Sequence, residues 1–442
     1  MSRVETETQP QTAAVPGHVP DIGETPNGVD PSQLSPEIER IDLSDPEYRE
    51  HAFARYEEMR AKCPVSRAIV TSGEGNEGNR AFFNRPLWLV TVYEEGSRAL
   101  LDRAITVEMT SVLTSEQLAQ MPETPEEFKP LQRNILTVDP PEHTRLRKLV
   151  QPSFTPAAAD EWRPAMRRHL ADLWEAVGSD GRCDFVEAFA KPYPALMIAE
   201  VMGAPTSDAP RLHGWANRIQ QQFDPVKIQN ELPDLEQAAA EFVDYTRALM
   251  REREAEPRDD LITQLIPAGE EGVHLVSAIL VGGVDTTQSQ LAHGIRLFAG
   301  NRGQWRKLGE DPELATAAAE EILRYEPITP FTARIVLEDI EYRDVLFPEG
   351  TLIFAVAASA NRDPESWEAP DELDIEAERD RAKPLTFGAG PHFCLGANLA
   401  RAELQEALAF LSQCMPELEL DGEPAFDSPL GVYGLDSLPI RW

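Results

Sequence analysis

The sequence contains little cysteine, and its four cysteines lie far apart. Cys63, Cys183, Cys394 and Cys414 form no CxxC pair, so they provide neither a cysteine-rich zinc site nor a dithiol redox motif. Dispersed thiols are typical of proteins in a reducing compartment and not of disulfide-bonded secreted domains. If one of these cysteines has a function, its own surroundings must supply it.

Positive charge and long hydrophobic runs are scarce as well. The 41 lysines and arginines stand against 76 acidic residues, which gives a net charge of −35. Such a surface repels nucleic acid and anionic lipid, so binding to either is disfavoured. The most apolar stretch, 275–284, stops at Asp285 and is shorter than the ~20 residues of a membrane span. Because the N-terminus also lacks a basic region and an apolar run, we expect a cytoplasmic protein.

The organisation along the chain indicates one domain after a tail. Residues 1–36 are rich in proline and poor in large apolar residues, which predicts a disordered segment. Residues 37–442 show no linker and no internal repeat, so we expect a single, mainly α domain with minor β. Helices are predicted at 156–177, 234–254, 271–299, 312–325 and 396–414, and strands at 87–93, 332–342 and 351–360.

The segment PLTFGAGPHFCLGANLA, residues 384–400, places Cys394 in a glycine-rich loop before an amphipathic helix. The unpaired amides and positive dipole end of a helix N-terminus favour a thiolate. Gly388, Gly390 and Gly396 permit a tight turn and the close approach of a flat partner. An isolated cysteine is more often an inert buried thiol, so the spacing Phe-Gly-x-Gly-x-His-x-Cys-x-Gly carries the functional interpretation.

The segment VGGVDTTQSQL, residues 281–291, interrupts an apolar helical run with two glycines, an acid and two hydroxyl side chains. A helix end at Gly282 and Gly283, followed by a helix that Asp285 or Thr286 caps, would explain the pattern. The residues alone leave open whether the segment is only such a boundary or part of a functional site.

Two charged pairs with helical spacing are weaker signals. Glu321 and Arg324 lie three apart, which is the spacing of an ordinary ion pair on one helix face. His143 and Arg147 lie four apart in DPPEHTRLRKLV, and a solvated basic face would account for them. The same two side chains could instead make charge-assisted hydrogen bonds to carboxylates.

These four segments, in this order, resemble the cytochrome P450 family, and the resemblance covers residues 37–442. It implies the P450 fold, an α-helical bundle around a haem with small β-sheets. It also implies haem b with the Cys394 thiolate as axial ligand, in a loop where Phe387, Gly390, His392 and Gly396 are in register. Where Gly282 stands the family more often has alanine, so this chain leaves more room over the iron.

The other site residues follow from the same resemblance. His143 and Arg147, with Arg334 and His392, correspond to partners of the haem propionates. Asp285 and Thr286 correspond to the acid and the alcohol that serve dioxygen in a groove of the long central helix. Glu321, Arg324 and Arg379 correspond to a structural group beneath the haem, although the segment before the haem loop is two residues longer than usual.

The implied activity is that of a haem-thiolate monooxygenase. Thiolate ligation favours cleavage of the O–O bond. Electrons from NAD(P)H would arrive through a ferredoxin or flavodoxin and its reductase, and a hydrophobic small molecule would be hydroxylated or epoxidised. The expected pocket segments are largely apolar with few aromatics, which favours a terpenoid, steroid or fatty acyl compound: 105–137, 210–232, 276–286, 327–330 and 430–434. We expect a monomer without a membrane span or a nucleic-acid partner.

Two alternatives remain at this stage. One is a peroxide-driven peroxygenase, against which the Asp285-Thr286 pair argues. The other is a non-catalytic haem sensor or carrier, which would need no proton relay. The acidic net charge further predicts that a ferredoxin needs a local positive patch near the cysteine loop. The basic residues in segments that the family places there are Arg145, Lys148, Arg379, Arg381, Lys383 and Arg401.

Overall fold

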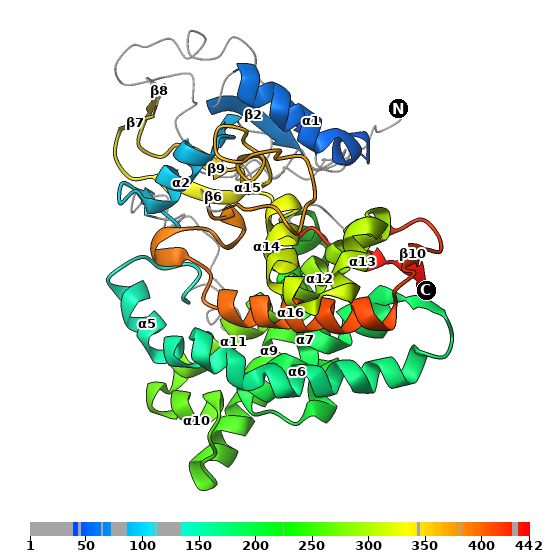
Figure 1. Cartoon of the computed structure of the whole chain (residues 1–442). Helices are drawn as coiled ribbons and strands as arrows, with labels where there is room; N and C mark the ends of the chain where they lie inside the picture. The colour runs from blue at the N-terminus through cyan, green and yellow to red at the C-terminus, as the bar shows by residue number, and fades with distance from the viewer. Residues whose placement is uncertain are drawn as a thin grey trace, which may run out of the picture.

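The computed structural model describes residues 39–42, 46–62, 65–71, 86–108, 111–112, 134–223, 225–342, 345–379, 382–426 and 432–442. The tail predicted over 1–36 lies outside the described residues. Within them the architecture is mainly α with small sheets, as the sequence predicts. The helices fill the lower part of the molecule in Figure 1, and the largest sheet lies above them with α1 beside it.

Helices of very different lengths follow one another along the chain. Their bounds are α1 (Pro46–Lys62), α2 (Tyr93–Leu101), α5 (Glu142–Val150), α6 (Pro156–Val177), α7 (Pro192–Met202), α8 (Ala209–Gln220), α9 (Pro225–Ala255), α10 (Leu261–Leu265), α11 (Glu270–Gly283), α12 (Asp285–Gly300), α13 (Arg302–Glu310), α14 (Ala315–Tyr325), α15 (Ala357–Ala360) and α16 (Ala397–Cys414).

The described strands form one six-stranded sheet, in the order β1-β2-β3-β9-β6-β4, and three smaller sheets. Neighbours in the larger sheet pair antiparallel, except for β1 with β2 and β3 with β9. The strands are β1 (Glu39–Asp42), β2 (Val65–Thr71), β3 (Pro86–Val90), β4 (Ile105–Thr106), β5 (Arg182–Asp184), β6 (Thr332–Val336), β7 (Ile340–Tyr342), β8 (Val345–Phe347), β9 (Leu352–Ala355), β10 (Glu419–Leu420), β11 (Ala425–Phe426), β12 (Leu435–Ser437) and β13 (Pro439–Arg441).

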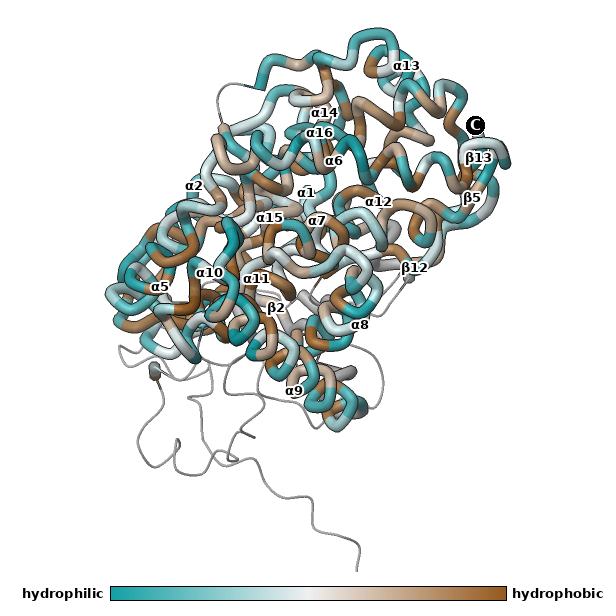
Figure 2. Tube along the Cα trace, turned by 90° about the horizontal axis from the view of Figure 1, so that it is seen from below, coloured by the Kyte–Doolittle hydropathy of each residue, from teal (hydrophilic) through white to brown (hydrophobic). Residues whose placement is uncertain are grey.

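The helix that follows the cysteine loop, α16, lies at the centre of the helical region. It packs between α6 on one side and α14 on the other (Figure 1). The leucines of its predicted apolar stripe are all buried: Leu399, Leu404, Leu408 and Leu411. Hydrophobic positions also concentrate around α7 and α11 in the interior, whereas the outer turns of α9 are hydrophilic (Figure 2). Since α16 is buried on several sides, it gives the preceding loop a rigid support.

The strand predicted over 351–360 is wrong in its second half. Strand β9 pairs with β6 only as far as Ala355, and Ala357–Ala360 then form the short helix α15 against α2. A short, continuously apolar run does not distinguish a buried strand from a buried helix, because it has no periodicity. The strand predicted over 332–342 is divided into β6 and β7.

None of the helices within the described ranges is long and apolar enough to cross a membrane.

Candidate haem site

Cys394 lies in a loop whose backbone is fixed by its own hydrogen bonds. The Cys394 amide donates to the carbonyl of Phe387 (2.9 Å), and the Ala397 amide donates to the Cys394 carbonyl (3.4 Å). Burial raises the pKa of the Cys394 thiol, while the backbone amide of Gly396 and the charges of Arg147 and Arg401 oppose that rise. The loop therefore presents the sulfur next to groups that stabilise its thiolate form.

The loop glycines have different functions. Gly388 and Gly390 have φ of 69° and 71°, in the left-handed region that favours glycine. A Cβ at Gly390 would also lie 2.7 Å from the carbonyl oxygen of Leu100 in α2, so this glycine allows the loop to pack against α2. Gly396 has open space around it among the described residues and lines the cavity that Cys394 faces.

That cavity has a volume of about 360 Å³ and is mainly apolar. Its wall includes Cys394 and Phe387 from the haem loop, and Gly282 and Thr286 from the junction of α11 and α12. The loop and the helix junction therefore face one space, although more than 100 residues separate them in the sequence. Strand β6 contributes Arg334 to the same wall.

The helix predicted over 271–299 is interrupted at Val284, which separates α11 from α12. The Val284 amide still reaches the Leu280 carbonyl, at 3.3 Å, but its φ and ψ of −93° and −72° depart from helical values. Thr286 donates its hydroxyl to the carbonyl of Gly282. Thr286 lines the cavity, whereas Asp285, only 5% exposed, is not among the described residues of that wall. The predicted acid and alcohol thus point in different directions.

Arginines on the cavity wall have too few partners for their charge. Arg334 is 8% exposed, and it donates one hydrogen bond, to the Ala333 carbonyl (2.8 Å). The described part of the chain offers it no carboxylate at ion-pair distance, and burial lowers its pKa to about 10 although Asp139 opposes this. Arg147 donates to the Pro391 carbonyl (3.1 Å). A buried guanidinium normally has an anionic partner, so this wall suits a ligand that carries carboxylates.

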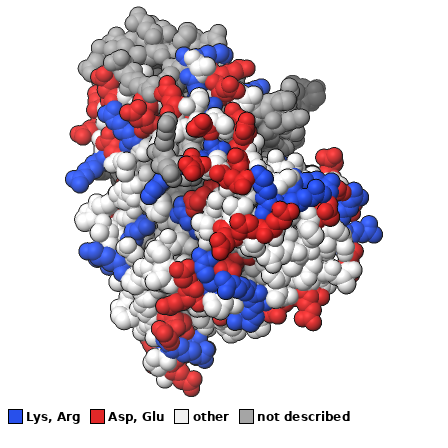
Figure 3. All heavy atoms as spheres, viewed as in Figure 1, with Lys and Arg blue, Asp and Glu red and all other residues white. Residues whose placement is uncertain are grey.

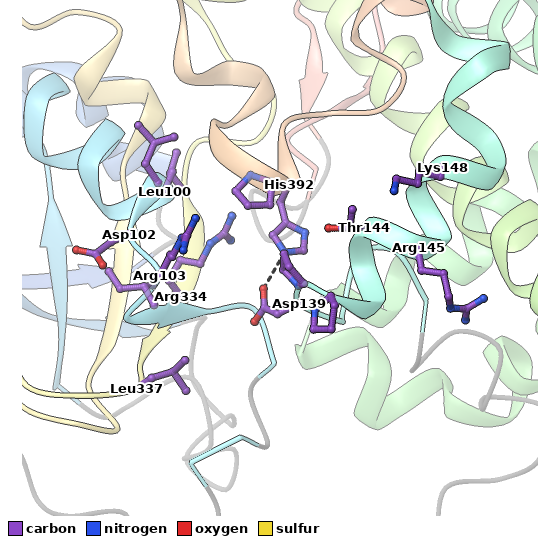
Figure 4. A pocket seen from close by; sticks show the side chains of 15 residues that line it. Leu100, Asp102, Arg103, Asp139, Thr144, Arg145, Lys148, Arg334, Leu337 and His392 are labelled. Carbon is purple, nitrogen blue, oxygen red and sulfur yellow. Dashed lines mark hydrogen bonds and ion pairs between the residues drawn. The ribbon is translucent and has the colours of Figure 1, made fainter.

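The two predicted histidines meet at the same wall. The rings of His143 and His392 lie 4.2 Å apart. Burial and the nearby His392 and Arg147 lower the pKa of His143 to about 4, so this ring is neutral at pH 7. His392 pairs through Nε2 with a carboxylate oxygen of Asp139 (2.9 Å), as Figure 4 shows. Arg334 and His392 also line a second pocket of about 990 Å³, the outer pocket, so they lie between it and the cavity.

Glu321, Arg324 and Arg379 form one buried cluster. Arg324 donates to both Glu321 oxygens, each at 2.9 Å, and Arg379 donates to the same two oxygens, each at 3.0 Å. Although burial opposes ionisation, these arginines lower the pKa of Glu321. Arg324 also donates to carbonyls of Asn361, Pro370 and Glu372. The cluster therefore ties α14 to the segment that leads into the haem loop, despite the two extra residues there.

Sequence reasoning missed three polar residues near the cavity. Asp139 precedes the double proline, and no sequence signal marks it as the partner of His392. Gln290 donates to the carbonyls of Ile322 (3.3 Å) and Glu326 (3.1 Å) and so joins α12 to the end of α14. Glu403 on α16 lines the cavity, and burial raises its pKa well above the ordinary value. Glu403 occupies a position on the buried face of α16, a signal that could have identified it.

The residues present fit a haem. Cys394 brings one thiolate ligand to the cavity wall, which suits a metal whose remaining ligands belong to a cofactor. The under-paired Arg334 and Arg147 and the two histidines suit its two carboxylates.

A model of the family "Cytochrome P450" matches residues 109–429 of this chain. The chain belongs to the cytochrome P450 family. Members use haem with a cysteine thiolate, activate dioxygen and receive electrons from redox partners, so this P450 is a monooxygenase that hydroxylates or epoxidises small molecules.

Relatives of this P450 share nearly their whole length with it. Cytochrome P450 107B1 of Saccharopolyspora erythraea is 33% identical over 412 residues, which are 90% of this chain and 96% of the relative. The mycinamicin IV hydroxylase/epoxidase of Micromonospora griseorubida is 32% identical over 402 residues, 88% and 95% of the two chains. The structure of a myxobacterial P450, CYP267B1 in complex with myristic acid, gives a TM-score of 0.80 at 31% identity and covers 90% of this chain and 98% of that one.

Proposed function

We propose that this P450 oxidises a bulky apolar molecule, with Cys394 as the iron ligand and Thr286 and Asp285 as the proton-handling residues. The observation that carries the proposal is the single cavity between the Cys394 loop and the Thr286 hydroxyl. A haem held there would be bound by Cys394, just before α16, and Thr286 at the junction of α11 and α12 would line the same cavity.

The cofactor would be held by charge and by shape. Arg334, Arg147 and His392 would bind the two carboxylates, and Cys394 would supply the axial thiolate. When bound, haem b with this ligand supplies the activation of dioxygen, in which one oxygen atom enters the substrate and the other leaves as water. The neutral ring of His143 can donate a hydrogen bond without adding charge.

Thr286 and Asp285 would have different roles in proton transfer. The Thr286 hydroxyl faces the cavity and donates its one hydrogen to the Gly282 carbonyl, so its oxygen can accept a hydrogen bond from water, and rotation of the hydroxyl would let it donate into the cavity instead. Asp285 is the first residue of α12 and is buried, and it is not among the described residues of the cavity wall. It would therefore receive protons away from the substrate. This separation keeps a carboxylate out of the apolar cavity.

The first prediction concerns the Thr286 hydroxyl. Thr286→Ala should retain haem and bind substrate, but product per NAD(P)H should fall by about tenfold or more while peroxide rises, because general-acid assistance is lost. Product, peroxide and NAD(P)H are measured together. Thr286→Ser keeps a hydroxyl and should stay near the parent ratio. Full coupling in Thr286→Ala would contradict the assignment.

The substrate is expected to be large and apolar. The cavity wall is dominated by apolar side chains, and its few hydroxyl groups include Thr287 and Thr329. One relative is named a mycinamicin IV hydroxylase/epoxidase, and another was solved in complex with myristic acid, which is a fatty acid. Terpenoids, steroids, macrolides and fatty acyl compounds should be screened for those that shift the haem Soret band. Turnover of the hits with NAD(P)H and a ferredoxin system, compared with peroxide alone, tests the proposed monooxygenase cycle against a peroxygenase.

We further propose a ferredoxin as the electron donor, but the expected positive patch is smaller than the sequence suggested. Arg145 pairs with Glu142 (2.7 Å) and Glu271 (2.6 Å), and Arg401 pairs with Glu320. Arg379 binds Glu321 in the buried cluster, and Arg381 lies outside the described residues. Positive side chains on this face alternate with negative ones (Figure 3). Paired arginines contribute little net field, because a neighbouring carboxylate cancels each charge.

Lys148 and Lys383 are the members of that set that are exposed without an ion pair within the described chain, and Lys148 is the one that lines the outer pocket. It is exposed on α5, lines the outer pocket with His392 (Figure 4), and has no ion pair within the described chain. Lys148→Glu should slow electron transfer from a [2Fe–2S] ferredoxin about threefold or more at low salt, with the difference vanishing at high salt. Arg251→Glu on α9 is the control and should leave the rate unchanged. If the electron-transfer rate changes neither in Lys148→Glu nor with salt, the donor docks on another surface.

A further inference from the structure

Two adjacent glycines end α11, and their surroundings differ. A Cβ at Gly283 would lie 2.4 Å from Cδ1 of Ile198 in α7, so this glycine lets the two helices pack closely. A Cβ at Gly282 would have no packed neighbour within 4 Å among the described residues. Packing therefore accounts for Gly283 and leaves Gly282 unexplained.

The backbone does not require glycine at position 282 either. Gly282 is the second-last residue of α11, and it is not among the glycines with positive φ. Glycine is among the least favourable residues in a helix, because it loses the most conformational freedom on folding. Alanine at this position would fit the backbone and favour the helix.

The empty space beside Gly282 belongs to the cavity. Gly282 lines the wall that also contains Thr286 and, across the cavity, Cys394. Its carbonyl accepts the Thr286 hydroxyl, so the residue sits next to the proposed proton-handling group. A side chain at 282 would therefore occupy part of the cavity, on the helix face that Gly282 shares with Thr286 four residues later.

We propose that Gly282 is a specificity-determining residue that widens the cavity beside Thr286. Without a side chain there, a branched or ring carbon of the substrate can approach the reacting position. A methyl group at 282 would restrict that position to narrower groups, such as the end of an unbranched chain. The inference rests on the proposed function, because the width matters only if substrate carbon is oxidised in this cavity.

The test compares two iron-binding azoles in the haem-loaded protein. Imidazole is small, whereas 4-phenylimidazole binds metals through its unhindered nitrogen and carries an additional phenyl ring that needs space above the metal. In Gly282→Ala the dissociation constant of 4-phenylimidazole should rise about tenfold or more, since overpacking a filled site is costly, while that of imidazole should change less than about twofold. The unfolding midpoint of the haem-loaded protein should be equal to or about 1 °C above the parent value.

Gly214→Ala is the matched control. Gly214 lies inside α8, has the same open space within 4 Å, and is not among the described residues of the cavity wall. It should give a similar midpoint and leave both azole affinities unchanged. Gly283→Ala, in contrast, should lower the midpoint because it forces Ile198 to move.

Three outcomes would overturn the inference while the proposed function stands. Gly282→Ala could bind both azoles like the parent, weaken both equally, or lose haem while remaining folded, which would mean that the space belongs to the cofactor. A parent protein that takes up no haem would instead overturn the proposed function, and this inference with it.

Discussion

Cys394→Ala is expected to abolish the spectrum of thiolate-ligated haem and all turnover with dioxygen. The loop around Cys394 brings one sulfur to the cavity, and the described residues contain no cluster of three metal ligands that could replace it. Arg334, Arg147 and His392 remain in the variant, so some haem should still bind, but without the ligand that favours O–O cleavage. The reduced carbon monoxide adduct is the measurement, recorded with the haem content of the same sample.

Cys414→Ala is the matched control for this prediction. Cys414 ends the same helix, α16, and is half-buried away from the loop. Its removal should leave the carbon monoxide spectrum unchanged. A thiolate-type spectrum that persists in Cys394→Ala, or disappears in Cys414→Ala, would show that the iron ligand has been misassigned.

Glu321→Gln is expected to cost ~3–5 kcal/mol of folding stability, as removal of one member of a buried ion pair does. The Glu321 carboxylate is shared by Arg324 and Arg379, whose side chains are 1% and 12% exposed. The neutral amide would leave two positive charges facing each other without compensation. Since whole domains have only ~5–15 kcal/mol of stability, low expression and poor haem retention should accompany the loss.

The neighbouring residue provides a control on the same helix turn. Glu320 pairs with Arg401, but these side chains are 37% and 24% exposed, so Glu320→Gln should cost ~1 kcal/mol or less. Arg379→Gln removes only the outer arginine and should fall between the two. Denaturant unfolding of the purified proteins measures the order, and equal costs for Glu320→Gln and Glu321→Gln would refute the special role of the cluster.

Local patterns predicted much of the helical architecture. The apolar spacing after Cys394 predicted α16 and its buried stripe, because a helix that buries one face must repeat its apolar residues with that period. The pattern was insufficient at 357–360, because an entirely apolar run is equally compatible with a strand and with a helix. There the end of the pairing with β6 decided the structure.

The charges show the limit of sequence reasoning most clearly. Arg145, Arg401 and Arg379 looked alike as candidates for a positive patch, yet each lies against a glutamate. Two of these glutamates, Glu320 and Glu321, are adjacent in the sequence but differ greatly in exposure. Partners that are distant in the chain determine whether a charge is free, and no local pattern contains that information.

The sequence by itself determined the family and predicted the residue types of the site, with Cys394 as the proposed iron ligand, because fixed spacings within short segments specify them. Only the tertiary structure decided that Asp139 partners His392. It also decided that, among the described residues, Asp285 is not part of the cavity wall that Thr286 joins and Arg334 has no carboxylate at ion-pair distance. It also separated Gly282 from Gly283, which are equivalent in the sequence. The physical reason is that burial and pairing arise between segments far apart in the chain, whereas a motif records only its own neighbours.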